Sequence, residues 1–360
     1  MMSRRRFMWM ASVALAACLA GAPFVADVPI AAQSLPSRLS DLEFWKLSSE
    51  SSEPNGYFRS DNLLSNETGF QYVVPDLIRT AKPGRVYMGV GPEQNFTYIV
   101  ATKPSMAFIV DVRRGNFDLQ LMYKALFDLS ADRAEFVSRL FSKKRPEGLD
   151  ARSTATEIFG KFWNVESGER ALYTENLTAV IDDLSKKHGF SLPPDDVRGL
   201  TYVYDAFYQF GPRIQYSSTG SFGAAFQPNY ADLMTATDLA GMARSFLATE
   251  ENFRFMKDLE ARNALVPVVG NFAGPKAIRA VGQYLKEKGA TVSAFYLSNV
   301  EQYLRQDGIW NDFCANVATL PLDESSTFIR SVRRTGDAAP GFGFVSELGN
   351  ILSDVKACRP

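Results

Sequence analysis

The sequence predicts an α/β fold with a mostly parallel sheet, helices on both of its faces and a helical insertion. Short apolar runs recur at residues 86–90, 106–111, 265–270 and 291–299, and each precedes a segment with helical spacing of apolar residues. Strands buried on both faces are continuous apolar runs, because helices cover both sides of a parallel sheet. Strands that alternate with helices of this length favour βαβ units over hairpins.

Composition sets the first limits on function. The chain has 360 residues, of which 46% are hydrophobic and 22% charged, with a formal net charge of −1. This length fits one large globular domain, and the near-neutral charge argues against a general nucleic-acid binder. The single histidine, His188, lies in a polar stretch where a helix is expected to end. One histidine excludes a metal site that needs two, so we expect no metal site, and it disfavours a Ser-His-Asp or Cys-His mechanism.

Residues 1–33 are predicted to be an export signal rather than part of the fold. Three arginines, Arg4 to Arg6, precede an apolar run that ends near Gly21. The string SRRRFM fits a twin-arginine signal, and a general secretory signal also favours such arginines. Cleavage has two interpretations: a lipobox that ends at Cys18, or an ordinary site near residues 31–33. The protein is therefore expected to be periplasmic or lipid-anchored to the cell envelope, with membrane contact only through this segment or a lipid on Cys18.

Two cysteines remain beyond the predicted signal, Cys314 and Cys358. An even number of thiols in an oxidising compartment permits a disulfide. Two unpaired, partly buried thiols are the alternative, and the sequence leaves both open.

Residues 34–360 are predicted to form a single domain, which begins with a polar lead-in. The aromatic pair Phe44 and Trp45 marks a first helix that packs on the domain. Residues 65–68, SNET, are either a lid element or the N-cap of a helix that runs through Leu77. The first strand, VYMGV, leads into a helix predicted over 92–103, since proline is tolerated at a first helical position.

The second strand, MAFIVD, precedes one or two helices over 116–140. Leu119, Met122 and Leu126 fall on one face of the first of these. Residues from about 150 to 263 contain mainly helical patterns and are predicted to be an insertion within the α/β order. The strand LVPVVG then leads to a helix over 275–289, with Gly289 as its C-cap. The strand TVSAFYLSN leads to a further helix that opens with VEQYL.

The ends of three predicted strands carry the candidate site. Glycines Gly89 and Gly91 follow the first strand, Asp111 ends the second, and Asn271 follows the third. In open α/β sheets, ligands bind at the carboxyl ends of the strands beside the switch point in strand order. Glycines let the backbone approach a ligand, and a carboxylate roughly 20 residues further on accepts ribose hydroxyls in dinucleotide folds. The pattern is Rossmann-like, but Gln94 occupies the third glycine position of GxGxxG.

The stretch VYMGVGPEQNFTYIVATKPSMAFIVDVRRGN resembles motifs I and II of class I S-adenosylmethionine-dependent methyltransferases. It is most similar to a divergent bacterial methyltransferase-like family marked by the strings GxGPEQNF and FIVDxRRxN. These strings cover about one tenth of the chain, with weaker similarity in the βα units after Leu265. The resemblance implies S-adenosylmethionine as cofactor. It also implies a binding site that includes Gly89, Gly91, Glu93, Asn95, Asp111 and Asn271.

Two positions depart from the methyltransferase pattern. Tyr87 stands where an acidic residue usually precedes the first glycine, and Glu93 replaces the third glycine of the family. Glu93 is either a substitute carboxylate for the ligand or a residue that favours a helix N-terminus. Arg113 and Arg114 are either an anion site or two surface charges at the start of a helix. Asn271 is either close to the transferred methyl group or a turn residue for conformational reasons.

Three functions compete. The first is an exported methyltransferase-like protein that binds S-adenosylmethionine or a related nucleotide. That cofactor is made in the cytoplasm, and twin-arginine export accommodates this because the route carries folded, ligand-loaded proteins. The second is a non-catalytic exported binding module that retains the fold. The third is an exported hydrolase that uses carboxylates such as Glu93, Asp111 or Glu67, although no spaced catalytic pair stands out. The sequence indicates no protein partner and no oligomeric state.

Overall fold

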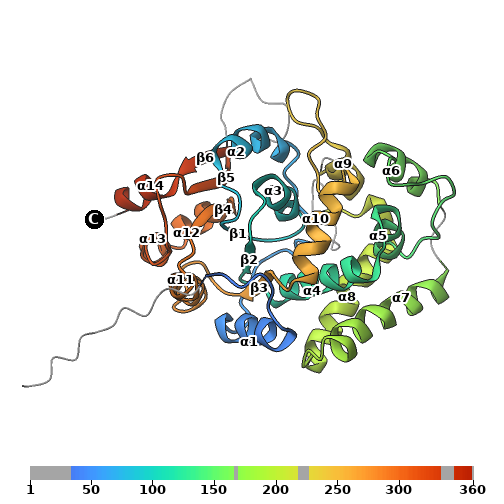
Figure 1. Ribbon diagram of the computed structural model, residues 1–360, viewed down its shortest axis with the longest axis horizontal. Coiled ribbons are helices and arrows are strands. Elements are labelled where there is room, and N and C mark those ends of the chain that lie inside the picture. The colour runs from blue at the N-terminus through green and yellow to red at the C-terminus, as the bar shows by residue number, and fades with distance from the viewer. Residues whose placement is uncertain (1–33, 166–168, 218–226, 334–343, 359–360) are drawn as a thin grey trace, which may run out of the picture. The chain divides into compact units, whose positions relative to one another are not determined.

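The computed structural model describes residues 34–165, 169–217, 227–333 and 344–358, which belong to one compact unit. The predicted export signal lies outside these residues. Within them, no helix has the length and apolar character needed to cross a membrane. The fold is α/β, with a mostly parallel sheet flanked by helices (Figure 1), as the sequence predicts.

Six strands form one sheet in the order β3-β2-β1-β4-β5-β6. The strands are β1 (Val86–Gly89), β2 (Met106–Asp111), β3 (Leu265–Val269), β4 (Val292–Ser298), β5 (Thr327–Arg333) and β6 (Phe344–Asn350). Neighbouring strands pair in parallel from β3 to β5, and β6 is antiparallel to β5. The order reverses direction between β1 and β4, which makes that point the topological switch of the sheet.

The helices before the third strand are α1 (Asp41–Ser51), α2 (Val74–Thr80), α3 (Gln94–Thr102), α4 (Arg114–Leu129), α5 (Arg133–Leu140), α6 (Ala155–Trp163), α7 (Arg170–Asp182), α8 (Pro194–Phe210), α9 (Tyr230–Thr235) and α10 (Glu250–Ala261). Short 3₁₀ turns cover Phe70–Val73 and Gly211–Arg213, and a π-helical turn covers Asp183–Lys187. The later helices are α11 (Ala277–Glu287), α12 (Val300–Gln306), α13 (Trp310–Val317) and α14 (Ile351–Ala357).

Two helix layers cover the sheet. Helices α3, α4 and α10 pack together on one side, while α11 and α12 contact β2 and β4 from the other (Figure 1). Helices α5 to α9 lie to the right of the sheet in this view, and α6 to α9 form most of the predicted insertion. Helix α10 contacts α3 and α4, so it belongs to the layer on the sheet although the insertion was predicted to extend to about residue 263.

Two local predictions need correction. Helix α3 begins at Gln94 rather than Pro92, because the residues after Gly91 form a turn with Glu93 as the N-cap. The helix expected to begin near Ser65 is instead a 3₁₀ turn followed by α2. The Ser65 hydroxyl is not a helix cap, because the helical residues begin only at Phe70. It accepts from the backbone N–H of Glu67 at 3.1 Å and donates to the side chain of Gln94.

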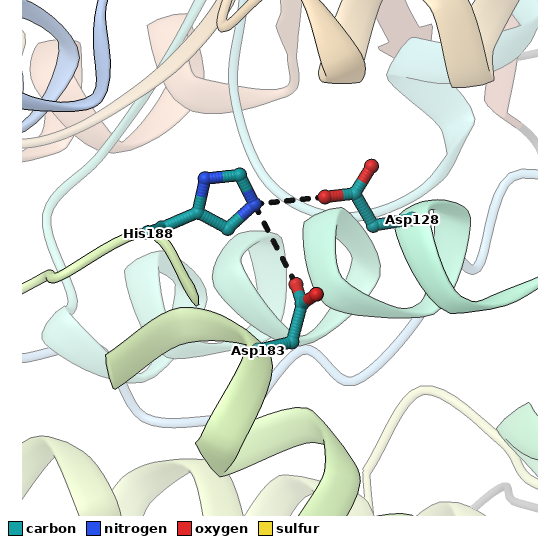
Figure 2. A group of neighbouring side chains, drawn as sticks. All are labelled: Asp128, Asp183 and His188. Atoms are coloured by element: carbon teal, nitrogen blue, oxygen red, sulfur yellow. Dashed lines mark hydrogen bonds and ion pairs between the residues drawn. The ribbon is translucent and has the colours of Figure 1, made fainter. Parts of the chain in front are cut away.

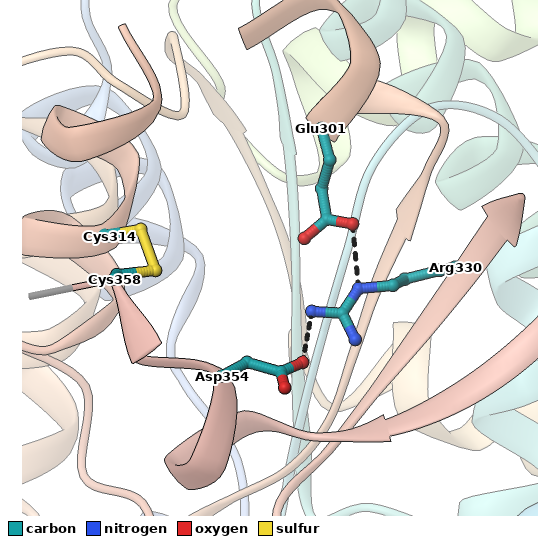
Figure 3. Close-up of a disulfide and its surroundings, with 5 residues drawn as sticks. All are labelled: Glu301, Cys314, Arg330, Asp354 and Cys358. Carbon is teal, nitrogen blue, oxygen red and sulfur yellow. Dashed lines mark ion pairs between the residues drawn. A yellow bond between two sulfur atoms is a disulfide. The ribbon is translucent and has the colours of Figure 1, made fainter. Parts of the chain in front are cut away.

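A disulfide joins Cys314 of α13 to Cys358 at the end of α14, with the Cα atoms 6.0 Å apart (Figure 3). The sequence left open whether these two cysteines are paired or free, and the structure shows that they are paired. Beside it, Arg330 of β5 forms ion pairs with Glu301 at 2.8 Å and Asp354 at 2.6 Å. The C-terminal elements are therefore held to the sheet edge by both a covalent and an ionic connection.

Candidate functional site

A large cavity lies at the carboxyl ends of the parallel strands, where the strand order reverses. Its volume is about 570 Å³. Residues that follow β1, β2, β3 and β4 form its floor, and segments at 57–67 and 302–309 contribute to its walls. Ligands of open α/β sheets bind in a crevice at this position, because loops distant in sequence meet there. The cavity therefore lies at the ends of the strands where the sequence predicts a site.

Three of the six predicted site residues line this cavity, namely Gly91, Asp111 and Asn271. The other three, Gly89, Glu93 and Asn95, do not line it, and the side chains of Glu93 and Asn95 are fully buried. The six predicted residues therefore form two groups. One group lines the cavity, and the other is buried in and next to the turn between β1 and α3.

Asn95 holds the turn between β1 and α3. Its amide nitrogen donates to the carbonyls of Val90 at 2.8 Å and Pro92 at 2.7 Å, and its Oδ1 accepts from the Tyr87 hydroxyl at 2.9 Å. A Cβ on Gly89 would lie 1.8 Å from Asn95 Oδ1. Gly89 is therefore needed to make room for the Asn95 side chain, and Tyr87 is a partner of that side chain.

Gly91 has a different requirement. Its φ is +78°, in the left-handed region that favours glycine, and a Cβ there would meet nothing within 4 Å. The two glycines of the motif thus do separate tasks. The first accommodates the chain itself, and the second turns the backbone beside the cavity.

Glu93 is the N-cap residue of α3 and is enclosed by protein. Its Oε1 accepts from the backbone N–H of Ser65 at 3.3 Å, and its Oε2 has no hydrogen-bond partner among the described residues. Burial raises the pKa of this carboxyl to about 8. At neutral pH it is therefore mainly protonated, and a direct contact with a ligand in the cavity would require the turn to move.

Asp111 is the last residue of β2. One of its carboxylate oxygens accepts a hydrogen bond from the protein, and the other accepts none from the described residues. Oδ1 accepts from the backbone N–H of Arg113 at 2.9 Å and lies 3.5 Å from the Arg113 Nε. No described residue donates a hydrogen bond to Oδ2, and the side chain lines the cavity. Burial raises the pKa of Asp111, an effect that Arg113 opposes.

The two arginines after Asp111 bind protein groups. Arg113 donates to the carbonyl of Asp61, and Arg114 forms a two-point ion pair with Asp196 of α8, with Nε 2.9 Å from Oδ1. The Arg114 guanidinium also lies 3.8 Å from the ring centre of Phe117. These contacts show that the two arginines are not free surface charges. The Nε and Nη2 atoms of Arg113 have no hydrogen-bond partner among the described residues, so an anion site at Arg113 stays a prediction.

Asn271 lines the cavity from a turn that its own side chain stabilises, with Oδ1 accepting from the backbone N–H of Ala273 at 2.9 Å. Glu53, just after α1, holds the same turn. Its carboxylate accepts from the backbone N–H groups of Asn271 at 3.1 Å and Ala277 at 2.9 Å. Sequence reasoning missed Glu53, because no local pattern links it to a turn more than 200 residues away.

Glu67 lines the cavity next to the end of β4 and was not among the predicted ligand-binding residues. Its Oε1 accepts from the hydroxyls of Tyr296 at 2.9 Å and Ser298 at 2.6 Å, and its Oε2 accepts from the side-chain amide of Gln94 at 3.0 Å. Burial, together with the Glu67 charge, raises the pKa of Tyr296 well above its usual range. The Tyr296 hydroxyl is therefore a donor to Glu67 rather than a base.

A separate cluster contains the only histidine. His188 lies between Asp128, 2.8 Å from Nε2, and Asp41, 2.7 Å from Nδ1, with Asp183 nearby (Figure 2). The Lys187 ammonium donates to Asp128 at 2.8 Å and Asp183 at 2.9 Å. Because the Lys187 ammonium and the His188 imidazole already bind these carboxylates, we interpret the cluster as a polar network that joins α1, α4 and the π-helical turn after α7, rather than as a metal centre.

Comparison of the sequence with known protein families assigns the chain to one of them. A family model described as a domain of unknown function (DUF7790) matches residues 63–345, and the chain belongs to this family. The matched region includes β1 to β5 and the cavity residues Glu67, Asp111 and Asn271. Among curated proteins, none matches the chain significantly.

Proposed function

We propose that this member of the DUF7790 family is a methyltransferase-like protein that binds S-adenosylmethionine or a related nucleotide in the cavity at the switch point. The observation that carries the proposal is the Asp111 carboxylate, which lines the cavity with Oδ2 unoccupied by the described residues. A carboxylate at the end of the second strand suits the vicinal diol of a ribose, since it accepts from both hydroxyls. Gly91, on the neighbouring strand end, leaves room for the ligand.

The start of α3 favours a nucleoside over a dinucleotide. Pyrophosphates bind at free helix N-termini. Here Glu93 is the N-cap, and the residues of the first turn of α3, Gln94 to Phe96, are all buried. A ligand without a phosphate at this turn fits the arrangement, and S-adenosylmethionine is such a ligand.

Titration calorimetry with S-adenosylmethionine and S-adenosylhomocysteine tests the proposal. Asp111→Asn should weaken binding about 5- to 150-fold, which corresponds to about 1–3 kcal/mol for lost hydrogen bonds to a charged group. Asp312→Asn, a change of the same kind on the exposed side of α13, is the matched control and should bind as the wild type does. If the folded wild type binds neither compound, the cofactor proposal is rejected. If both variants bind equally well, Asp111 is structural and the site lies elsewhere.

The second candidate is a non-catalytic exported binding module. It is favoured by the turn after β1, where Tyr87 and Asn95 hydrogen-bond to each other in place of the usual acidic residue. Mass spectrometry of the denatured protein separates the two candidates further. A methyltransferase should release S-adenosylhomocysteine when acceptors are supplied, whereas a binding module should retain its ligand unchanged.

We further propose that the protein is exported, periplasmic or lipid-anchored through Cys18. The arginine-rich leader supports this, and so does the Cys314–Cys358 disulfide, because structural disulfides persist in oxidising compartments. The intact mass of the protein from the cell envelope tests it. A mature chain that begins near residue 34, or a lipid-modified Cys18, is expected, and a full-length cytoplasmic chain would contradict it.

A further inference from the structure

Glu67 is a buried carboxylate without a cationic partner. Only 8% of the residue is exposed, and that part faces the cavity. Its hydrogen-bond donors are two hydroxyls and one amide, all neutral, from β4 and α3. Within the described part of the chain, no Lys, Arg or His nitrogen lies within 4.0 Å of either oxygen.

Two other buried acids of this chain, Asp196 and Glu250, are compensated differently. Asp196 pairs with Arg114, and Glu250 pairs with Arg133 at 3.1 Å. Removing a carboxylate from water is costly unless an opposite charge or several hydrogen bonds replace the solvent. Glu67 has the hydrogen bonds but no opposite charge, and it differs from the paired acids in facing a cavity. A ligand cation in that cavity would supply the missing partner.

The backbone at the end of β4 is arranged to support Glu67. Ser298 has a φ of +50°, although it is not glycine, and the pairing of β4 with β5 shifts register between Tyr296 and Ser298. A left-handed conformation is unfavourable for a residue with a Cβ, because the Cβ comes too close to the following carbonyl oxygen. The same irregular segment supplies both hydroxyls that bind Glu67 Oε1. Strained residues that persist beside a cavity are typical of binding sites.

The strand order sets the geometry of a ligand that spans the cavity. Asp111 ends β2, Gly91 follows β1, and Ser298 ends β4, and these three strands are consecutive in the sheet. Neighbouring strands lie about 4.8 Å apart, so β2 and β4 are separated by roughly 10 Å. A nucleoside whose diol contacts Asp111 would cross Gly91 and extend its 5′ substituent toward Glu67.

We propose that Glu67 is the recognition residue for a positively charged group, an ammonium or a sulfonium, on the 5′ side of the bound nucleoside. This inference rests on the proposed function and adds a specificity to it: the cavity selects nucleosides that carry a positively charged group on the 5′ side over those that lack one. Gln94, Tyr296 and Ser298 are positioning residues that hold the carboxylate toward the cavity.

Three ligands that differ in charge test the inference by calorimetry. Methylthioadenosine is neutral at its 5′ side, S-adenosylhomocysteine has an ammonium and a carboxylate there, and S-adenosylmethionine has these two groups and a sulfonium. Glu67→Gln should weaken the two charged ligands about 10- to 100-fold, the scale expected for a charge-assisted contact. It should change methylthioadenosine binding less than about twofold. Glu251→Gln, an exposed residue of α10, makes the same change in net charge and should alter none of the three affinities.

Each outcome of this experiment supports or overturns the role of Glu67 in cation recognition. Unchanged methylthioadenosine binding shows that the variant keeps its fold and its cavity. A loss confined to S-adenosylmethionine assigns Glu67 to the sulfonium, whereas a similar loss for both charged ligands assigns it to the ammonium. If all three ligands weaken equally, or none does, the cation-recognition inference is overturned while the proposed function stands. If the folded wild type binds none of the three, both are overturned.

Discussion

Replacing either glycine of the β1–α3 turn with alanine separates its two tasks. At Gly89 the new Cβ would overlap Asn95 Oδ1, 1.8 Å away, and would come within 3.0 Å of the Tyr87 ring. At Gly91 it would meet nothing within 4 Å, and the only penalty is the φ of +78°. The same chemical change two residues away is therefore a matched control.

The expected decreases in the free energy of unfolding follow from these contacts. Overpacking typically costs about 1–3 kcal/mol, and each hydrogen bond that Asn95 loses when it is displaced adds about 1 kcal/mol. Gly89→Ala should therefore lower the free energy of unfolding by at least about 3 kcal/mol. Gly91→Ala should lower it by only about 1–2 kcal/mol, the cost of a left-handed residue.

Urea unfolding followed by circular dichroism measures both variants, and a double-mutant cycle identifies the cause. If the overlap with Asn95 is responsible, Gly89→Ala combined with Asn95→Ala should cost less than the sum of the single changes. Equal costs at Gly89 and Gly91 would refute the assignment of separate tasks. Strict additivity in the cycle would refute Asn95 as the group that requires Gly89.

The remaining predictions concern stability. The disulfide closes a loop of 44 residues, so Cys314→Ser, or reduction of the wild type, should lower the unfolding free energy by about 4 kcal/mol in urea titrations, and equal stability with and without reductant would contradict this. The hydrogen bond that the His188 imidazole donates to the Asp128 carboxylate raises the pKa of His188 above its usual value. The stabilisation from this contact should therefore be complete below about pH 6.5 and lost as pH rises through the folded-state pKa of His188. The advantage of the wild type over His188→Asn in unfolding free energy should therefore shrink toward alkaline pH, and a constant difference from pH 5.5 to 9 would exclude this linkage.

Strands β1 to β4 could be predicted from the sequence because each is buried on both faces. MAFIVD and LVPVVG are continuous apolar runs, and both are fully buried in the sheet. Strands β5 and β6 were not predicted, because TFIRSVR and FVSELGN interrupt the apolar pattern with charged residues. Arg330 is accommodated there only through its ion pairs with Glu301 and Asp354, which no local pattern reveals.

The candidate site could be predicted only where topology alone brings residues together. Gly91 and Asp111 are strand-end residues, so a parallel sheet is sufficient to place them at one cavity. Glu67 is different, because it precedes β1 and its partner Tyr296 is 229 residues further along the chain. The distinction between Gly89 and Gly91 was likewise hidden, since it depends on where the Asn95 side chain points.

The positions of the disulfide and the cavity bear on how a cytoplasmic cofactor could accompany an exported protein. The bridge joins α13 to α14, whereas the cavity floor is formed at the ends of β1 to β4. Neither cysteine lines the cavity. If the proposed ligand and the proposed export are correct, the ligand-binding part would fold and bind its ligand before the bridge forms, and oxidation after export would then stabilise a protein that already contains its ligand. On this order of events the reduced wild type should be less stable in urea yet should bind S-adenosylmethionine with unchanged affinity. A ligand affinity that depends on the bridge would mean that the cavity matures only after oxidation, and loading before export would then be excluded.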